Sequence, residues 1–275
     1  MPWRVIDSGA SSAAGNMAAD EAIMLAHGAG EAPPTLRFYG WRPAAVSLGY
    51  FQRAAAEIDL DACHARGIDV VRRLTGGRAV LHDAELTYSV VVREDFPGVP
   101  PTITGAYRWF SGGLLDGLKR LGVEAGLSIP PAAYGQGRRS KHASAACFDA
   151  PAQYELTCAG RKLAGSAQVR KNGVILQHGS LLLRFDAAKV AAILRLPSPE
   201  ARAATAAMLA GRAIGLEEAL GRLPAWTELT DALTAGFAAA LADEFVPGGL
   251  TAGERAVAAT LAAEKYGCDS WNLLR

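Results

Sequence analysis

The clearest element in the chain is a strand, because hydrophobic and polar positions alternate over residues 85–93. Their sequence, Glu-Leu-Thr-Tyr-Ser-Val-Val-Val-Arg, has the period of two that is typical of a β-strand. Residues 35–41 and 45–51 are rich in β-branched and aromatic side chains, which predicts two more strands joined by a turn that contains Pro43. We expect these two strands to form a hairpin. The same kind of pattern predicts further strands at 154–158, 161–170 and 174–185.

Helical segments lie between these strands. Residues 16–27 are rich in helix formers and begin with a capping-type residue, Asn16, and a short helix is expected at 58–66. Residues 105–121 carry a single apolar stripe at helical spacing. Its members are Trp109, Phe110, Leu114, Leu115, Leu118 and Leu121. Strands and helices alternate in blocks, which predicts an α+β fold of mixed, mainly antiparallel sheets flanked by helices.

The last part of the chain has a different composition. From about residue 186 it is rich in Ala and helical in pattern, with interruptions at Pro197, Pro199, Pro224 and the Pro-Gly-Gly of residues 247–249. The sequence contains no flexible linker before this change. We therefore expect residues 1–275 to form a single domain, in which the region from about 186 is a helical layer or a small helical subdomain.

Length and charge exclude several classes of protein. The chain has 275 residues, of which 50% are hydrophobic and 20% charged, so it can bury a large core. Its formal net charge of +1 provides no general field for nucleic acid, and we expect no nucleic-acid partner. No window approaches the length of a membrane span, and the first residues do not form a basic segment followed by an apolar run. We therefore expect a cytoplasmic protein with no membrane partner.

Cysteine and histidine spacing gives no sign of a disulfide framework or a metal site. The four cysteines, at 63, 147, 158 and 268, contain no Cys-x-x-Cys pair, and the five histidines show no metal-ligand spacing. We expect free thiols and no metal.

One thiol and one amine lie close enough along the chain to share a site. Cys147 lies in Ala-Ala-Cys-Phe-Asp-Ala-Pro, and Lys162 lies in the run Gly-Arg-Lys-Leu-Ala-Gly-Ser-Ala-Gln that follows. A thiolate is the reactive form of cysteine and a nearby cation lowers the thiol pKa, so the pair suits covalent acyl transfer. The alternative is that Cys147 is an inert core cysteine, as most cysteines in apolar stretches are.

A second candidate site is the block of residues 72–83, Arg-Arg-Leu-Thr-Gly-Gly-Arg-Ala-Val-Leu-His-Asp. Adjacent glycines, Gly76 and Gly77, let the backbone approach a ligand closely and offer N–H groups to an oxyanion. The flanking Arg73 and Arg78 are candidate substrate-binding residues, and His82 is expected to support the site from behind. The alternative is an ordinary Gly-Gly turn within a hairpin.

Small residues near Lys162 leave room for a thin, extended ligand such as an acyl chain. Gly165, Ser166 and Ala167 form one such patch and residues 177–180 form another, although either could be a bulge. Residues 130–144 are rich in Pro, Gly, Ser and basic side chains, which indicates either a solvated loop or a docking patch. Its basic residues are Arg138, Arg139, Lys141 and His142.

Taken in order and spacing, these motifs resemble the biotin/lipoate protein ligase and transferase superfamily. The resemblance also rests on residues 38–41, 47–52, 173–180 and 264–272, so it covers essentially the whole chain. Within the superfamily the chain is most similar to the cysteine-dependent octanoyl-[acyl-carrier-protein]:protein N-octanoyltransferases of lipoate biosynthesis. Ligases of the superfamily typically have a third glycine where this chain has Arg78, and Asn-Asp after a non-cysteine residue near Cys147. The ATP site is therefore not carried over, and no cofactor is expected.

The resemblance implies a two-step reaction. Cys147 would accept octanoyl from octanoyl-acyl carrier protein and pass it to the acceptor lysine of a lipoyl domain, with glycine cleavage protein H the expected acceptor. Lys162 would organise the acyl carbonyl or assist proton transfer. Three alternatives remain open: an amidotransferase between lipoyl domains, an ATP-dependent lipoate ligase, and a non-enzymatic acyl-binding protein.

Overall fold

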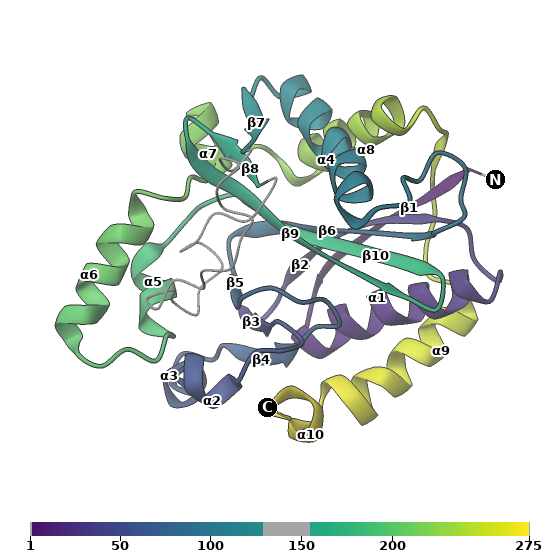
Figure 1. Cartoon of the computed structure of the whole chain (residues 1–275). Coiled ribbons are helices and arrows are strands. Elements are labelled where there is room, and N and C mark those ends of the chain that lie inside the picture. Colours follow the sequence, from purple (N-terminus) through teal and green to yellow (C-terminus); the bar gives the residue numbers. More distant parts are fainter. Residues whose placement is uncertain (1, 129–154, 275) are drawn as a thin grey trace.

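A computed structural model describes residues 2–128 and 155–274, which form two sheets flanked by helices (Figure 1). The larger sheet has eight strands in the order β11-β1-β2-β6-β10-β9-β8-β7. Its strands are β1 (Trp3–Ser11), β2 (Thr35–Trp41), β6 (Glu85–Arg93), β7 (Ala125–Leu127), β8 (Leu156–Cys158), β9 (Arg161–Lys171), β10 (Val174–Leu182) and β11 (Phe245–Pro247). The smaller sheet has the order β4-β3-β5, formed by β4 (Asp69–Arg72), β3 (Ala45–Leu48) and β5 (Val80–His82).

Helices cover both faces of the larger sheet. The pair α4 and α8 packs on one face, while α1 and α9 lie on the other (Figure 1). The helices before β8 are α1 (Ala13–Gly28), α2 (Ala54–Glu57), α3 (Leu60–Ala65) and α4 (Ile103–Arg120). Those after β10 are α5 (Ala187–Ala192), α6 (Pro199–Ala210), α7 (Leu216–Leu220), α8 (Trp226–Leu241), α9 (Ala252–Leu261), the π-helical turn η2 (Ala262–Tyr266) and α10 (Asp269–Asn272).

The largest hydrophobic core lies between the larger sheet and the α4–α8 pair. Leu86, Tyr88 and Val90 on β6 pack there with Phe110 on α4 and Phe237 on α8, all fully buried. The opposite side of β6 carries Glu85, Thr87 and Ser89, which are buried as well. The alternation seen in the sequence therefore separates a hydrophobic core from a buried polar layer, rather than a core from solvent.

The α+β class with mixed, mainly antiparallel sheets is confirmed. Only the β1–β2, β1–β11 and β3–β4 pairs of the described strands run parallel. The expected strand at 85–93 and helix at 105–121 are present as β6 and α4, and the strands expected after residue 154 are present as β8, β9 and β10.

The predicted hairpin of residues 35–41 and 45–51 is wrong. Both strands form, but β2 pairs with β1 and β6 in the larger sheet, whereas β3 pairs with β4 and β5 in the smaller one. The turn at Pro43 carries the chain from one sheet to the other. Local propensity identified the strands, but their partners come from distant parts of the chain.

The start of the first helix needs correction. The first helix begins at Ala13 and is capped by the Ser12 side chain, which accepts from Gly15 N–H, while Asn16 is buried inside the helix and donates to the Gly40 carbonyl. The region after residue 186 is mainly helical, and β11 adds a short strand beside β1. In the part of the chain that the structure describes, no helix combines the length and hydrophobicity needed to cross a bilayer.

Candidate functional site

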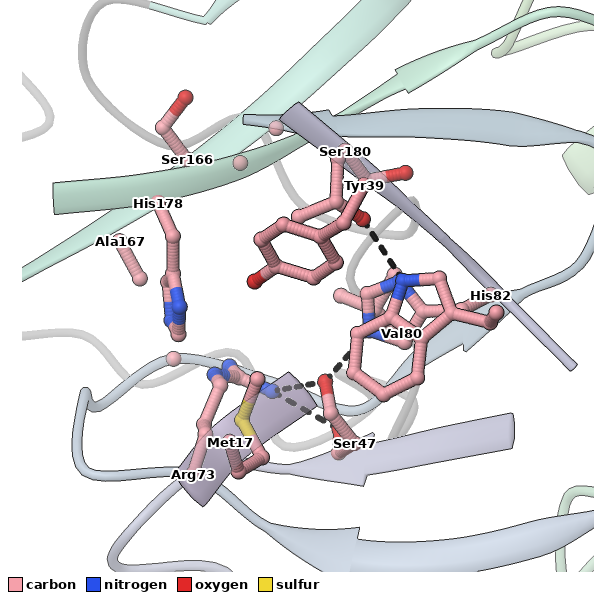
Figure 2. A pocket seen from close by; sticks show the side chains of 15 residues that line it. Met17, Tyr39, Ser47, Arg73, Val80, His82, Ser166, Ala167, His178 and Ser180 are labelled. Atoms are coloured by element: carbon pink, nitrogen blue, oxygen red, sulfur yellow. Dashed lines mark hydrogen bonds between the residues drawn. The ribbon is translucent and has the colours of Figure 1, made fainter. Parts of the chain in front are cut away.

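A cavity lies between the polar face of the larger sheet and the smaller sheet (Figure 2). The space among its lining side chains is about 430 Å³, including the solvent at its mouth. Strands β2, β6, β9 and β10 line one side, and β3, β5 and the Gly76–Gly77 loop line the other. The lining residues are Met17, Tyr39, Trp41, Ser47, Arg73, Gly77, Val80, His82, Thr87, Gly165, Ser166, Ala167, His178, Gly179 and Ser180.

The Gly-Gly loop is not the turn of a hairpin. It joins β4 to β5, which lie on opposite sides of β3, so the loop crosses the end of that strand. A Cβ on Gly49, at the end of β3, would lie 2.0 Å from the Gly77 carbonyl oxygen, and Gly77 itself has a φ of +96°. Close backbone approach and a left-handed conformation therefore explain these glycines.

Arg73 organises this loop from inside. Its guanidinium donates to the carbonyl oxygens of Gly76 and Arg78 at 2.8 Å and to the Ser47 carbonyl at 2.8 Å. Gly76 and Arg78 thus take part through their carbonyls, which Arg73 holds. Arg73 and Gly77 line the cavity. The arginine binds protein carbonyls in this structure, which stabilises the shape of the pocket.

Small residues on β9 and β10 form the opposite wall. Gly179 pairs with Ser166, and a Cβ at Gly179 would lie 2.4 Å from the Ser166 hydroxyl and 2.7 Å from the Gly165 carbonyl. The pairing of the two strands is regular from Ala164 to Lys171, so the patch at 165–167 is not a bulge. Residues 177–180 also pair regularly, so neither patch is a bulge, and the register shift of β9 lies earlier, next to Lys162.

A Ser–His–Glu chain runs along the cavity. Arg73 donates to Ser47 Oγ at 3.0 Å, so the Ser47 hydroxyl can donate to His82 Nε2 at 2.8 Å. His82 Nδ1 then donates to Glu85 at 2.7 Å, and Glu85 also accepts from Thr87 and Ser180. The buried Glu85 carboxylate fixes the ring of His82. This ring stacks on the indole of Trp41, with 4.0 Å between the ring centroids.

A second buried histidine lies at the cavity wall. His178 Nε2 is 2.7 Å from Thr75 Oγ1, and His178 Nδ1 is 3.5 Å from Asp20. Burial lowers the pKa of His178 even though Asp20 acts to raise it. Burial also works to raise the pKa of Asp20, but the Arg37 guanidinium and His178 outweigh it and hold that pKa below its usual value. His178 is therefore neutral and Asp20 ionised at neutral pH.

Lys162 lies outside the lining of this cavity. It is at the start of β9, buried, with its ammonium bonded to the Glu155 carboxylate. Gly165 follows three residues later on the same strand, a distance of roughly 10 Å. Cys147 and the basic residues Arg138, Arg139, Lys141 and His142 lie outside the described residues.

The structure thus brings together most of the sequence candidates. Arg73, Gly77, His82 and the patch at 165–167 line one cavity, although they come from segments far apart in the chain. The second small-residue patch, 177–180, also contributes, because His178, Gly179 and Ser180 line the cavity. Tyr39, Trp41, Ser47 and Thr87 line it as well but were not among the predicted site residues. The signal for Thr87 was available, because polar residues at every second position of a strand otherwise made of hydrophobic residues indicate a buried polar site.

The cavity offers a mainly apolar space among small and aromatic side chains. In residues 2–128 and 155–274, no cluster of three or more His, Cys, Asp or Glu side chains is arranged to hold a metal ion. The apolar lining suits an aliphatic chain, whereas the fixed histidines and serines give the cavity polar edges.

Comparison with known proteins identifies the family of this chain. The family model described as lipoyl protein ligase A/B catalytic domain matches residues 12–238. The octanoyltransferase LipM of Kyrpidia tusciae is 50% identical over 270 residues, covering 98% of both chains. The octanoyltransferase LipM of Bacillus subtilis is 44% identical over 273 residues, covering 99% of this chain and 98% of that protein.

Solved structures of lipoate ligases share the fold over the whole chain. A chain from the bipartite lipoate protein ligase and E2 lipoyl domain system of Thermoplasma acidophilum superposes with a TM-score of 0.80 at 27% identity, covering 100% of this chain and 98% of that one. A lipoate-protein ligase A bound with ATP has a TM-score of 0.78 at 28% identity, covering 99% of both chains. The family model and these relatives show that the chain belongs to the lipoyl protein ligase A/B catalytic domain family, within the biotin/lipoate ligase and transferase superfamily.

Proposed function

We propose that this protein is an acyltransferase of lipoate biosynthesis that transfers octanoyl from octanoyl-acyl carrier protein to the acceptor lysine of a lipoyl domain. The preferred acceptor in this proposal is glycine cleavage protein H. The observation that carries it is an apolar cavity walled by Gly165, Ser166 and Gly179, in a chain 50% identical to a protein named octanoyltransferase. Small residues leave space along the strands for an extended aliphatic chain.

The proposed reaction has two steps. The Cys147 thiolate attacks the carbonyl of the carrier thioester, and the carrier thiolate leaves and takes up a proton. The acceptor lysine, as the neutral amine, then attacks the octanoyl-Cys147 thioester, so that an amide forms, the cysteine leaves as a thiolate and the amine proton passes to a base. The first step exchanges one thioester for another and the second runs downhill to an amide, so neither needs a nucleotide.

Lys162 acts on the acyl oxygen in this proposal. A buried cation near a developing oxyanion stabilises the tetrahedral intermediate of both steps. Replacement by Ala is expected to slow transfer by orders of magnitude, and Arg is not expected to restore it, because its planar head is larger and cannot give up a proton.

Intact-mass analysis tests the covalent step. The protein is mixed with octanoyl-acyl carrier protein without ATP, and an apo lipoyl domain is added afterwards. We expect the mass of one octanoyl group on the wild type, its disappearance on addition of acceptor, and no such species for Cys147→Ala. Cys158→Ala is the matched control, because Cys158 is the described thiol nearest to Lys162 in the sheet and its removal should leave both steps intact.

The same assay separates the alternatives. A requirement for ATP with free octanoate or lipoate would identify a ligase, and transfer from an octanoylated lipoyl domain but not from the carrier would identify an amidotransferase. Binding of octanoyl without any covalent species would identify a binding protein. Normal transfer by Cys147→Ala would exclude the acyl-cysteine mechanism.

Acyl-chain length tests the cavity. Each buried methylene contributes about 0.8 kcal/mol, whereas a chain longer than a closed cavity overlaps its end wall. Octanoyl donors are therefore expected to react faster than both hexanoyl and dodecanoyl donors. Equal rates for all three would exclude a closed acyl tunnel.

The whole of residues 1–275 is proposed to act as one catalytic domain. Support comes from the C-terminal Trp271 and Asn272, which bind the backbone of Arg72 beside the Gly-Gly loop. The helical region after residue 186 would then belong to the same domain as the cavity.

A further inference from the structure

Lys162 lies at an irregularity of the sheet. In the pairing of β8 with β9, Thr157 is opposite Lys162 but Leu156 is opposite Ala164, so Leu163 is an extra residue on β9. Such a bulge interrupts the regular alternation of side chains and re-aims the residue beside it. The direction of the Lys162 side chain is therefore set by a local departure from regular pairing.

The backbone of Lys162 is held on its other side by the segment before α7. Its N–H donates to the Arg212 carbonyl at 2.8 Å, and its carbonyl accepts from Ile214 N–H at 2.9 Å. The bulge on β9 and these two backbone hydrogen bonds together fix the point from which the Lys162 side chain leaves the sheet.

The Glu155 side chain meets the end of Lys162. The two side chains are only 8% and 5% exposed, and the Lys162 ammonium is bonded to Glu155 Oε1. Burial without a counter-charge disfavours the charged form of a lysine, whereas a carboxylate in contact with it favours that form. The backbone carbonyl of Glu155 accepts from Ser128 N–H at 2.8 Å, which holds the Glu155 backbone in place.

Other ionisable groups of the described elements lie beside this pair. Cys158 lies on β8, Arg161 precedes Lys162 on β9, and Arg212 lies in the segment before α7. Arg161 binds Glu218 of α7 at 2.6 Å, in an exposed ion pair. Glu155 places an acidic side chain in contact with the Lys162 ammonium.

We propose that Glu155 is a positioning residue, which keeps Lys162 protonated and fixes the direction of its side chain. The inference rests on the proposed octanoyl transfer and assigns a role that the cysteine and lysine alone do not explain. Glu155 does not touch the acyl group. It acts by fixing the charge and direction of Lys162, so the ammonium is ready before the thioester binds.

Glu155→Gln removes the charge and preserves the shape. The single-turnover rate of octanoylation is expected to fall at least tenfold at pH 8. Its decline at alkaline pH should begin at a lower pH than in the wild type, because Lys162 loses its proton more easily without the carboxylate. Glu155→Asp keeps the charge and should restore the wild-type pH profile with part of the rate. Superimposable profiles for wild type and Glu155→Gln would overturn the inference.

Glu218→Gln is the matched control. It breaks the ion pair of the neighbouring residue, Arg161, at a site where the Glu218 side chain is 61% exposed. Exposed pairs contribute little, so neither the rate nor the pH profile should change.

Two further results separate the possible failures. A wild type that gains no octanoyl mass would contradict the proposed function itself, whereas an octanoylated wild type with an unaffected Glu155→Gln contradicts only the role of Glu155. Should Glu155→Gln not fold, the wild type is titrated by NMR of its labelled lysine ammonium groups, with Lys162→Arg for assignment. Lys162 is expected to be protonated at pH 8, and a neutral amine at that pH would overturn the inference.

Discussion

At the scale of single residues, the cavity depends on two buried carboxylates that each fix a histidine. Glu85 holds His82, and Asp20 holds His178 while also accepting from the Tyr39 hydroxyl at 2.8 Å. Burial and the nearby Asp20 raise the pKa of Tyr39 well above its usual value, so its hydroxyl remains a donor. Each polar group therefore has a defined role as donor or acceptor, which a lining of unfixed side chains would not provide.

The buried His178 is expected to make the stability of the folded protein sensitive to acid. Its pKa is lower in the folded state than the unfolded value of about 6.5, chiefly through burial. The unfolded chain therefore binds the proton better, and stability is lost as pH falls below that value. We expect His178→Gln to show a smaller decrease in Tm between pH 7 and pH 5 than the wild type.

The exposed His64 provides the control, since His64→Gln should leave the decrease unchanged. Asp20, whose pKa is lowered, contributes to stability that is lost only at lower pH, as its folded pKa is crossed. An identical decrease for His178→Gln and wild type would show that His178 does not control this step.

At the scale of elements, the sequence predicted strands and helices better than their partners. The alternation of β6 was recognisable because one side of it packs against a hydrophobic core. The pairing of β3 was not, because it depends on β4 and β5, and short strands of three or four residues carry little pattern of their own. The same limit hid β7 and β11.

The candidate site divides in the same way. Arg73, the Gly-Gly pair and the small residues at 165–167 were found because glycine pairs and small-residue patches are local signals. Tyr39, Trp41 and Ser47 were not predicted as site residues, because their place in the cavity depends on which strands pair, and residue type gives no information on that.

The close crossing of α4 and α8 predicts that an alanine at Gly236 destabilises the protein, although helix propensity alone would predict the opposite. A Cβ on Gly236 of α8 would lie 2.4 Å from the Gly113 carbonyl and 2.3 Å from the Gly117 nitrogen of α4. Because backbone atoms of a packed helix cannot yield easily, Gly236→Ala is expected to lower the free energy of unfolding by about 1–3 kcal/mol. Urea unfolding measures the difference.

Gly112 is the matched position on α4. A Cβ there would meet the Ala240 Cβ at 3.7 Å, which is an ordinary contact. Alanine is favoured over glycine in a helix by about 1 kcal/mol, so Gly112→Ala should be neutral or stabilising. Equal effects of the two substitutions would contradict the close helix contact.

At the scale of the whole molecule, the C-terminal helices are held against elements from the N-terminal part of the chain. The Arg4 guanidinium of β1 forms a buried bidentate pair with Glu254 of α9, at 2.6 and 2.8 Å. Lys265 and Tyr266 both bind Glu21 of α1. These contacts dock the C-terminal helices on the face of the sheet opposite α4 and α8 (Figure 1).

The C-terminal segment also reaches the loop that borders the cavity. Asn272 accepts from Arg72 N–H at 2.9 Å through its side chain and from the Arg72 guanidinium at 3.0 Å through its carbonyl. The same guanidinium donates to the carbonyls of Gly49 and Gln52, and Gly49 packs on Gly77. A continuous set of contacts thus connects the C-terminus to the Gly-Gly loop.

Asn272→Ala tests whether this connection matters for the cavity. It leaves the buried Arg72 N–H without its partner, at an expected cost of about 1–3 kcal/mol in stability. Because Arg72 also holds the loop that supports Gly77, the rate of octanoylation should fall at temperatures where the variant is still fully folded. Leu274→Ala, at a side chain 45% exposed, should change neither quantity. A destabilised Asn272→Ala that keeps the full rate would mean that the C-terminus stabilises the fold without shaping the site.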